Sequence, residues 1–215
     1  MSAPANPRHP LKTQLLQRLQ GLGWEQALLA SAQPEIDEII HRLEALNPIP
    51  HPLEESHWPA LLGTWELLYA SQGTVLTRQL GNLRPLPIQI KRIWQRLTRS
   101  VQASPPIATE NGAVLSLPLV GEITAIAQGT WQPYEEGESA NVSFGSFTLQ
   151  STRIFGIAGL HLPPVTVPVL DVLRREALWI TSYLDEDLRF GRGATGNVFV
   201  FCRSRAANPQ FLNKS

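Results

Sequence analysis

The acidic run Asp185–Asp187 comes closest in this sequence to residue types that could do catalytic chemistry. Paired carboxylates act as acid and base when their surroundings separate their pKa values. In an alternating strand, Asp185 and Asp187 share a face with Arg189, whereas Glu186 points to the other side. The alternative is a local salt-bridge network beside a turn, which also includes Arg192. No nucleophile, base and orienting group come together here, so we predict that the protein is not an enzyme.

The segment Gly191–Gly196 has the G-x-G-x-x-G spacing of dinucleotide-binding loops. Such a loop must lead into a helix whose N-terminus holds the pyrophosphate. Here the apolar run Asn197–Phe201 follows and predicts a strand instead. We therefore predict a glycine-rich hairpin turn and no nucleotide cofactor.

The other candidate nucleophiles and metal ligands are scattered along the chain. The five histidines form no H-E-x-x-H pattern, and no G-x-S-x-G elbow occurs. Cys202 is the single cysteine, so neither an internal disulfide nor a cysteine-rich metal site can form. It lies near the end of an apolar strand, where we expect it to pack in the core. The sequence thus predicts no metal and no cofactor.

Composition narrows the classes of function further. The 215 residues carry eighteen basic and eighteen acidic side chains, and this balance argues against a dedicated nucleic-acid binder. The longest uncharged stretch, 154–170, is interrupted by Pro163, Pro164 and Pro168, which argues against a membrane helix. Because no signal, transit or transmembrane segment is evident, we expect a protein that is cytoplasmic or peripheral to a membrane.

The elements that must position these residues begin with two predicted helices. Leucines at helical spacing run from Leu11 to Leu22, and a second helix is predicted from near Pro34 to Asn47-Pro48. The apolar stripe of the second helix comprises Ile36, Ile39, Ile40, Leu43 and Leu46. Short amphipathic helices cannot bury such stripes alone, so they must pack on something downstream. We divide the chain into a helical segment with linker (1–57), a β domain (58–205) and a C-terminal tail (206–215).

From Pro59 onward the pattern changes to short strands separated by glycine, proline and asparagine. The run 63–70 places Trp65, Leu67 and Tyr69 on one face. Further strands are predicted at 113–119, 122–132, 141–152, 178–190 and 197–203, and a phase shift at Gly145-Ser146 indicates a bulge. Many short strands favour a sandwich or a barrel without distinguishing the two.

A basic segment departs from this β pattern. Between Glu66 and Glu110 the sequence contains no acidic residue. Apolar residues at helical spacing over 88–101 predict an amphipathic helix of the kind that lies at a membrane interface. The predicted membrane-facing residues are Lys91, Arg92, Trp94, Arg96 and Arg99. The alternative is a helix or long strand that packs on the β domain and leaves its basic face in solvent.

Three motifs resemble the plastid lipid-associated protein family, also called PAP/fibrillins. They are Leu43-Glu44-Ala45-Leu46-Asn47-Pro48, then Leu62-Gly63-Thr64-Trp65-Glu66-Leu67-Leu68-Tyr69, and finally 183–190 with Gly191-Arg192-Gly193 and 196–200. Together they cover roughly residues 40 to 203. The resemblance implies a mainly β fold, a lipocalin-like antiparallel β-barrel preceded by a short N-terminal helical segment. The absence of a long transit sequence before Leu11 fits a cyanobacterial-type member or a trimmed chain.

The resemblance also implies roles for individual residues. Gly63-Thr64-Trp65 is similar to the first-strand G-x-W of lipocalins, in which the tryptophan closes one barrel end and a late arginine packs over it. By analogy, Trp65 is the plug, and Arg203, Arg192 or Arg189 is its cation–π partner. We therefore assign Trp65, Arg192 and Arg203 to barrel closure.

The function implied by the resemblance is non-enzymatic binding of a lipid or other small hydrophobic molecule, such as a prenylquinone, carotenoid or fatty acid. Binding would occur in a barrel cavity, peripheral to thylakoid-type membranes. An eight-stranded barrel is about the size that holds one small ligand. We predict Tyr69, Tyr183 and Arg189 as ligand contacts, because a tyrosine combines an apolar ring with a hydroxyl that suits an amphiphile's polar end. Core packing is the alternative for both tyrosines.

A second function remains open, that of a structural or interaction protein. Such a protein would coat lipid bodies or tether an isoprenoid-metabolism enzyme, with side chains filling its barrel. The face shared by Ala125, Ala127 and Gly129 favours a cavity if it points inward, whereas Trp131 on the same face does not.

Overall fold

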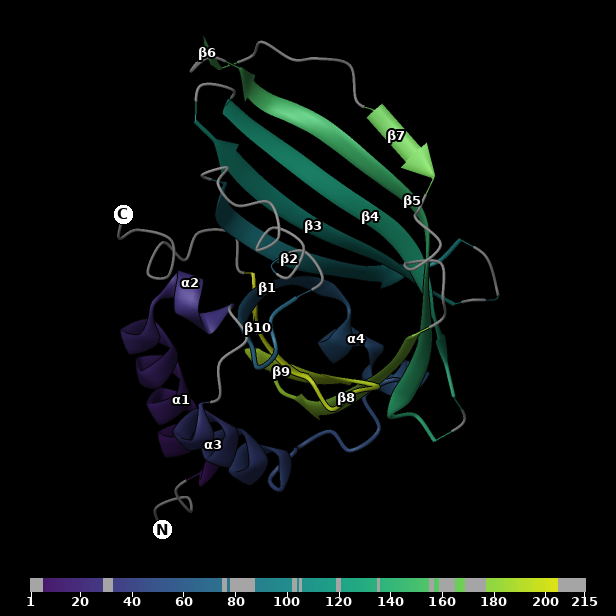
Figure 1. Cartoon of the computed structure of the whole chain (residues 1–215). Coiled ribbons are helices and arrows are strands. Elements are labelled where there is room, and N and C mark those ends of the chain that lie inside the picture. Colours follow the sequence, from purple (N-terminus) through teal and green to yellow (C-terminus); the bar gives the residue numbers. More distant parts are fainter. Residues whose placement is uncertain are drawn as a thin grey trace.

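Eight of the strands that the structure describes close into one antiparallel ring (Figure 1). Around the ring they are β1 (Gly63–Ala70), β2 (Gln89–Arg99), β3 (Ile107–Leu117), β4 (Gly121–Pro133), β5 (Ser139–Ile154), β8 (Ala177–Leu184), β9 (Leu188–Gly193) and β10 (Val198–Arg203), which pairs with β1. The short strands β6 (Ile157–Ala158) and β7 (Val165–Pro168) pair with β5 outside the ring. The mainly β, barrel-forming fold is confirmed.

The computed structural model describes residues 6–28, 33–74, 77, 88–101, 104, 106–118, 121–134, 136–154, 157–158, 165–168 and 177–204. The predicted tail, 206–215, lies outside these ranges.

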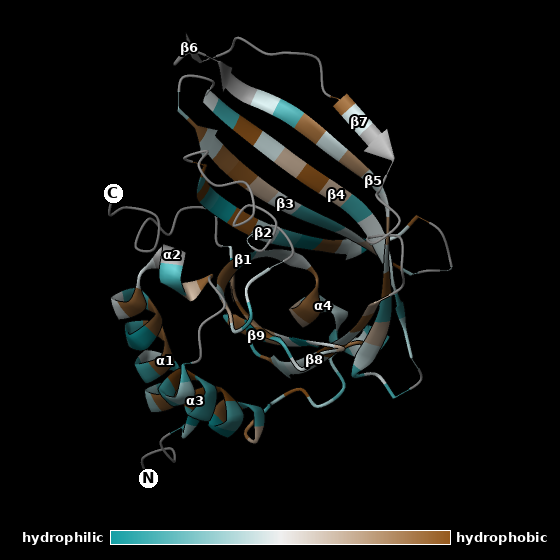
Figure 2. Ribbon diagram, viewed as in Figure 1, coloured by the Kyte–Doolittle hydropathy of each residue, from teal (hydrophilic) through white to brown (hydrophobic). Residues whose placement is uncertain are grey.

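The ring is uneven in height. Strands β2 to β5 have 11 to 16 residues, whereas β1, β8, β9 and β10 have only 6 to 8. The long strands therefore continue as a curved wall past the end of the short ones (Figure 1). Hydrophobic and hydrophilic residues alternate along this wall, as expected of strands whose two faces meet different surroundings (Figure 2).

Both predicted helices are present and cover the outer face of the short strands. Helix α1 (Arg8–Leu22) and helix α3 (Pro34–Glu44) flank the short α2 (Trp24–Ala27). Proline in the first turn of α3, followed by Glu35 and Asp37, suits the positive end of a helix. A 3-10 turn, η1 (Glu55–His57), and the short α4 (Trp58–Leu61) lead into β1.

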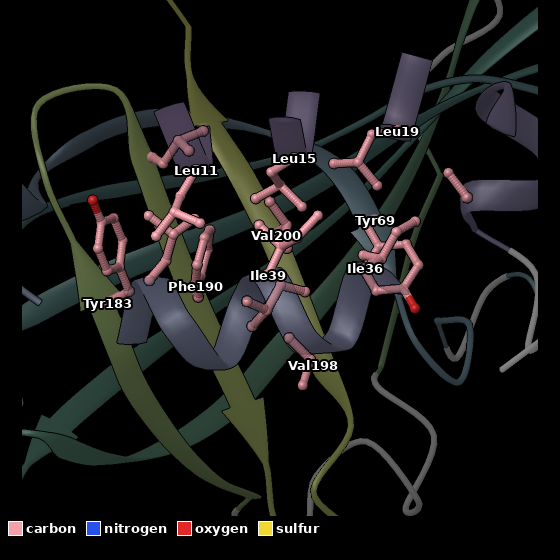
Figure 3. Packing of buried hydrophobic residues seen from close by; sticks show 14 residues of the cluster. Leu11, Leu15, Leu19, Ile36, Ile39, Tyr69, Tyr183, Phe190, Val198 and Val200 are labelled. Carbon is pink, nitrogen blue, oxygen red and sulfur yellow. The ribbon is translucent and has the colours of Figure 1, made fainter. Parts of the chain in front are cut away.

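Two hydrophobic cores result. The helix–sheet core lies between the helices and the outer face of the barrel (Figure 3). Its residues are Leu11, Leu15, Leu19, Ala27, Ile36, Ile39, Ile40, Leu43, Tyr69, Tyr183, Leu188, Phe190, Val198 and Val200. The barrel core lies inside the ring and includes Trp65, Leu67, Leu97, Ile107, Trp131, Ala140, Val142, Leu184 and Phe201. Leu46, expected in the helical stripe, lies beyond the end of α3 and is 38% exposed.

Bulges in two strands decide which tyrosine faces which core. The register shifts between Leu67 and Tyr69 in β1 and between Thr181 and Tyr183 in β8. One extra residue reverses the inward–outward alternation that follows it. Trp65 and Leu67 therefore face inward, while Tyr69 packs under the helices. The prediction that all three share a face is wrong for Tyr69.

A third bulge confirms a prediction. Gln128 pairs with Ser146 and Gly129 with Phe144, so Gly145 is the extra residue in β5. The segment 194–197 forms the predicted hairpin turn between β9 and β10, with Gly196 at a φ of 76°. A left-handed backbone conformation of this kind favours glycine.

The segment 88–101 is a strand, and the predicted helix is wrong. Residues 89–99 form β2, which pairs with β1 on one side and with β3 on the other. A bulge between Ile90 and Arg92 changes the phase of the strand. Because side chains alternate along a strand, residues three apart lie on opposite faces, with Leu97 inside the barrel and Trp94 outside. Pairing with two neighbouring strands outweighs the local helical pattern.

Candidate functional site

Aromatic side chains pack inside one end of the barrel. Trp131 and Trp179 lie 5.7 Å apart between ring centroids, and Trp179 lies 5.3 Å from Phe199. Gly191 makes this packing possible, because a Cβ there would lie 1.8 Å from the ring of Trp179. This end of the interior is therefore occupied by the protein's own side chains.

The same end is closed by α4, Trp65 and Arg203. The indole N–H of Trp65 donates to the Leu61 carbonyl at 2.8 Å, and the Arg203 guanidinium lies 4.2 Å from the Trp65 ring. Arg203 also donates to the carbonyls of Ala60, Leu62 and Glu186, at 3.0 Å for Leu62. Because the last carbonyls of a helix lack intrahelical donors, a guanidinium at this position satisfies them.

Arg192 occupies a different place from the one expected. It lies on the outer face of β9, where its Nε and Nη2 donate to the two carboxylate oxygens of Glu44 in α3, at 2.8 and 2.7 Å. This bidentate pair holds α3 against the sheet. The structure thus corrects the expectation that Arg192 packs over Trp65, since that place is taken by Arg203 and Arg189.

Arg189 lies inside the barrel and is 0% exposed. Its guanidinium carbon is 5.1 Å from the ring of Trp65, 5.7 Å from that of Trp131 and 4.7 Å from that of Phe201. Nη2 donates to the Oε1 atom of Gln95, whereas Nε and Nη1 have no hydrogen-bond partner among the described residues. Burial, and then the charge of Arg203, lower the pKa of Arg189 to about 9, so the side chain remains cationic at pH 7.

Further polar groups inside the barrel lack partners. The Oγ1 atom of Thr109 and the Nε1 atom of Trp131 are buried and without a hydrogen bond in the described part of the chain. Thr109 and Trp131 share the inward face of the β3–β4 pair, since Ile107 pairs with Trp131 and Thr109 with Gly129. Buried polar groups are normally hydrogen-bonded, so several unpartnered ones in one interior need an explanation.

A short polar chain leads away from Arg189. Gln95, itself 5% exposed, donates from Nε2 to the Oδ1 atom of Asn111 at 2.9 Å. Asn111 is only half-buried and pairs with Ala127 on β4. The contacts therefore connect the fully buried cation to a part of the inner face that solvent reaches.

The inner face next to Asn111 is apolar and combines small residues with larger ones such as Phe147, which pairs with Ala127. Ala113 pairs with Ala125 across β3 and β4, and Ala125 and Ala127 lie on the same face as Trp131. This face points inward, as the expectation of a cavity required. On β5, Leu149 pairs with Ala125 and is 37% exposed. We call Ala113, Ala125, Ala127 and Leu149 the inner wall.

The two tyrosines predicted as ligand contacts are separated from Arg189. Both lie in the helix–sheet core, on the outer face of the barrel (Figure 3). The Tyr183 hydroxyl donates to Asp185 at 2.6 Å, and that of Tyr69 donates to Asp37 at 3.4 Å. Burial first, and then these carboxylates, raise both tyrosine pKa values well above the usual range. Neither tyrosine faces the barrel interior, so only Arg189 of the three predicted contacts is positioned to meet a ligand there.

The acidic run forms a salt-bridge network, with a partner that the sequence did not indicate. Lys12 in α1 donates to Asp185 at 2.8 Å and to Asp187 at 3.1 Å. Asp185 also accepts the backbone N–H groups of Asp187 and Leu188. Burial raises the pKa of Asp185, but the hydrogen bonds from Lys12, Tyr183 and the backbone outweigh it, and the net pKa is lowered. These carboxylates hold α1 on the barrel.

The five predicted membrane-facing residues are placed differently from one another. Arg92 donates to Glu66 at 2.8 Å and lies over Trp94, which is only 7% exposed. Arg99 pairs with Glu55 at 2.7 Å. Lys91 and Arg96 are exposed. A membrane role for these residues stays a prediction. Lys91, Arg96 and Arg99 offer exposed charge for it, and of these Arg99 is paired with Glu55.

The polar residues of the interior were missed by sequence reasoning. Gln95 lies between Ile93 and Leu97 at a spacing of two, and Thr109 and Asn111 alternate in the same way between Ile107 and Ala113. Polar residues at inward positions of an otherwise apolar alternation were the available signal. It could be read only after the inward face was known, because 88–101 also fits a helix.

Comparison with known proteins agrees with the resemblance to the PAP/fibrillin family. The family model PAP_fibrillin matches residues 9–202. The chain is 30% identical over 210 residues to plastid lipid-associated protein 3, chloroplastic, of Brassica campestris, covering 81% of this chain and 55% of that protein. It is 28% identical over 221 residues to plastoglobulin-1, chloroplastic, of Pisum sativum, covering 90% and 60%.

Another relative is the chromoplast-specific carotenoid-associated protein of Cucumis sativus, 28% identical over 224 residues, with 91% of this chain and 68% of that protein covered. The chain thus spans little more than half the length of some of these relatives. No solved structure matches it.

Proposed function

The chain belongs to the PAP/fibrillin family, and from that premise we propose that it binds one lipid or other small hydrophobic molecule inside its barrel without transforming it. The observation that carries the proposal is the inner wall, an inward face on which Ala113, Ala125 and Ala127 lie between the packed aromatic cluster and solvent-accessible Leu149. Small inward residues are what a ligand-holding barrel needs, because large ones would fill it.

The names of the relatives support the same class of ligand. One is named for association with plastid lipid and another for association with carotenoid. Burial of an apolar chain contributes about 0.8 kcal/mol per CH₂ group. A fifteen-carbon tail on the inner wall would therefore contribute on the order of 10 kcal/mol before the costs of association and ordering are subtracted.

The residues with catalytic potential are engaged elsewhere, which supports a non-enzymatic role. Asp185 binds Lys12 and Tyr183, and burial raises the pKa of the Cys202 thiol to about 12. A thiol with so high a pKa is protonated at neutral pH and is a poor nucleophile.

We place this binding at a thylakoid-type membrane surface. No helix in the described ranges has the length and apolar character needed to cross a bilayer. Exposed Lys91 and Arg96 would contact anionic lipid. Neutralising both should reduce flotation with anionic vesicles at low salt, and unchanged flotation would contradict a membrane role for β2.

Native mass spectrometry tests the binding directly. Protein purified without detergent and incubated with thylakoid lipid extract should gain the mass of one small molecule, which organic extraction then identifies. Ala127→Phe, which fills the inner wall, should reduce the bound fraction at least tenfold. Gln128→Phe adds the same ring at the neighbouring, outward position and should leave binding unchanged. A protein mass that stays unshifted after incubation would contradict the proposal.

That unshifted mass would favour the second candidate, a structural or interaction protein. The aromatic cluster around Trp131 and Trp179 supports this alternative, since it shows that at least one end of the barrel is filled. Under this reading the contacts would be made by the exposed sides of α1 and α3.

A further inference from the structure

We propose that the ligand carries an anionic oxygen headgroup, a carboxylate or a phosphate, and that Arg189, Trp131 and Thr109 bind this group at the inner end of the barrel. The inference rests on the proposed function, because it names the chemical class of the ligand held there. It excludes neutral molecules such as carotenes and quinones as the preferred ligand.

The inner end of the barrel holds a buried positive charge. Arg189 is fully buried, and no described carboxylate forms an ion pair with it. The neighbouring charge that acts on it is that of Arg203, which has the same sign. Contacts with the faces of aromatic rings compensate only part of what a buried cation loses in hydration. The interior therefore lacks one negative charge.

The inner end of the barrel also holds hydrogen-bond donors without acceptors among the described residues. Besides the Ser182 hydroxyl, the buried side-chain atoms without a partner among the described residues are Nε and Nη1 of Arg189, Nε1 of Trp131 and Oγ1 of Thr109. The three nitrogens can only donate, and a threonine hydroxyl can donate as well. Donors gathered without acceptors are complementary to a group that offers several lone pairs and no proton. A carboxylate or phosphate is such a group, and its bonds to a guanidinium are charge-assisted.

Side-chain hydrogen bonds connect Arg189 to the edge of the inner wall. The polar chain from Arg189 through Gln95 to Asn111 ends beside Ala127, which belongs to the inner wall. A headgroup at Arg189 would therefore leave its apolar tail along Ala113 and Ala125, toward exposed Leu149. A neutral hydroxyl or carbonyl oxygen could accept a hydrogen bond from one of these unpartnered donors, but it would leave the positive charge of Arg189 uncompensated.

The experiment compares three sixteen-carbon probes, palmitic acid, hexadecyl phosphate and hexadecanol, titrated at pH 8 and followed by native mass spectrometry. The wild-type protein should bind at least one anionic probe about 30-fold more tightly than the alcohol, equivalent to about 2 kcal/mol. The two anionic probes show which headgroup is preferred. Arg189→Met should remove this preference and change affinity for the alcohol less than threefold.

Arg192→Met is the matched control, because Arg192 lies on the same strand but faces outward and pairs with Glu44. It should keep the full preference for the anion. Arg189→Lys retains the positive charge and should keep part of the preference for the anionic probe. If Arg189→Met does not fold, the wild-type comparison of acid with alcohol still decides.

The outcomes separate the two proposals. Wild-type protein that binds the alcohol as tightly as both anions overturns the headgroup inference and leaves binding of hydrophobic molecules standing. A preference that survives in Arg189→Met also overturns it. Wild-type protein that binds none of the three probes, nor anything from a lipid extract, overturns the proposed function itself.

Discussion

Gly112 and Trp94 form a cross-strand pair on the outer face of the barrel. The structure predicts whether a substitution at Gly112 stabilises or destabilises the protein when Trp94 is present and when it is replaced. The two residues lie opposite each other in β3 and β2, and the indole covers the glycine. A Cβ at Gly112 would lie 2.0 Å from Cζ2 of Trp94. Since carbon atoms pack at roughly 3.5 to 4.0 Å, Gly112→Ala must lift the ring by roughly 1.5 Å or more.

The cost follows from the burial of the ring. Trp94 is 7% exposed and lies beneath the Arg92 guanidinium at 4.8 Å. If lifting exposes roughly half of the roughly 200 Å² that a tryptophan buries, the loss is about 2.5 kcal/mol at about 25 cal/mol per Å². Replacing glycine by alanine in a strand returns about 0.5–1 kcal/mol. We therefore expect Gly112→Ala to destabilise the protein by about 2 kcal/mol.

The sign should reverse once the ring is removed. In a Trp94→Val background nothing covers Gly112, so Gly112→Ala should stabilise by about 0.5–1 kcal/mol. Urea unfolding followed by far-ultraviolet circular dichroism measures all four proteins without depending on tryptophan fluorescence. Gly145→Ala is the control, because a Cβ there meets no atom within 4 Å, and it should behave alike in both backgrounds. An equal loss from Gly112→Ala in both backgrounds would refute the reasoning.

Three further predictions concern buried groups. Trp65→Phe removes the hydrogen bond to Leu61 and leaves a void in the core. The unfolding free energy should therefore fall by about 3 kcal/mol and the melting temperature by roughly 6–12 °C. A loss of unfolding free energy below about 1 kcal/mol would contradict the plug role of Trp65. The folded-state pKa of Asp185 is lowered, so its stabilisation is complete above the unfolded pKa of about 3.9 and disappears as pH falls through the lower folded pKa. Asp185→Asn should therefore lose less unfolding free energy than the wild type between pH 6 and pH 2, and equal losses would speak against this network. The pKa of the Cys202 thiol is raised to about 12. This thiol should therefore react with a disulfide reagent at pH 8 at least about 100-fold more slowly in the native protein than in urea. Comparable rates in the two conditions would show that the thiol is accessible in the native protein.

Local patterns predicted much of the fold. The leucines from Leu11 to Leu22 and the isoleucine stripe after Pro34 each follow a helical period within one segment, and both helices are present. The alternation in 63–70 and the glycine-rich turn at 191–196 likewise specify a strand and a hairpin. Backbone periodicity and turn chemistry depend on neighbours in sequence, so they can be read without a structure.

The candidate site was less predictable, because bulges and partners decide it. One extra residue before Tyr69 and another before Tyr183 turn both rings out of the barrel, and no motif marks either position. Trp94 looks like part of a helical stripe until β1 and β3 are known to pair with its strand. The errors at Tyr69 and Tyr183 came from continuing a local alternation across a bulge, and the error at 88–101 came from a helical period in a segment that pairs with two strands.

By itself, the sequence determined two N-terminal helices, a run of short strands and an arginine-rich final hairpin, and its resemblance to the PAP/fibrillin family added the barrel and the closing role of Trp65. Only the tertiary structure decided that Arg189 lies inside while Arg192 lies outside, and that Gln95, Thr109 and Asn111 face it from strands far away in sequence. The physical reason is that ring closure joins β4 to β5 and β10 to β1. That closure creates an interior whose charge and hydrogen-bond balance no single segment contains.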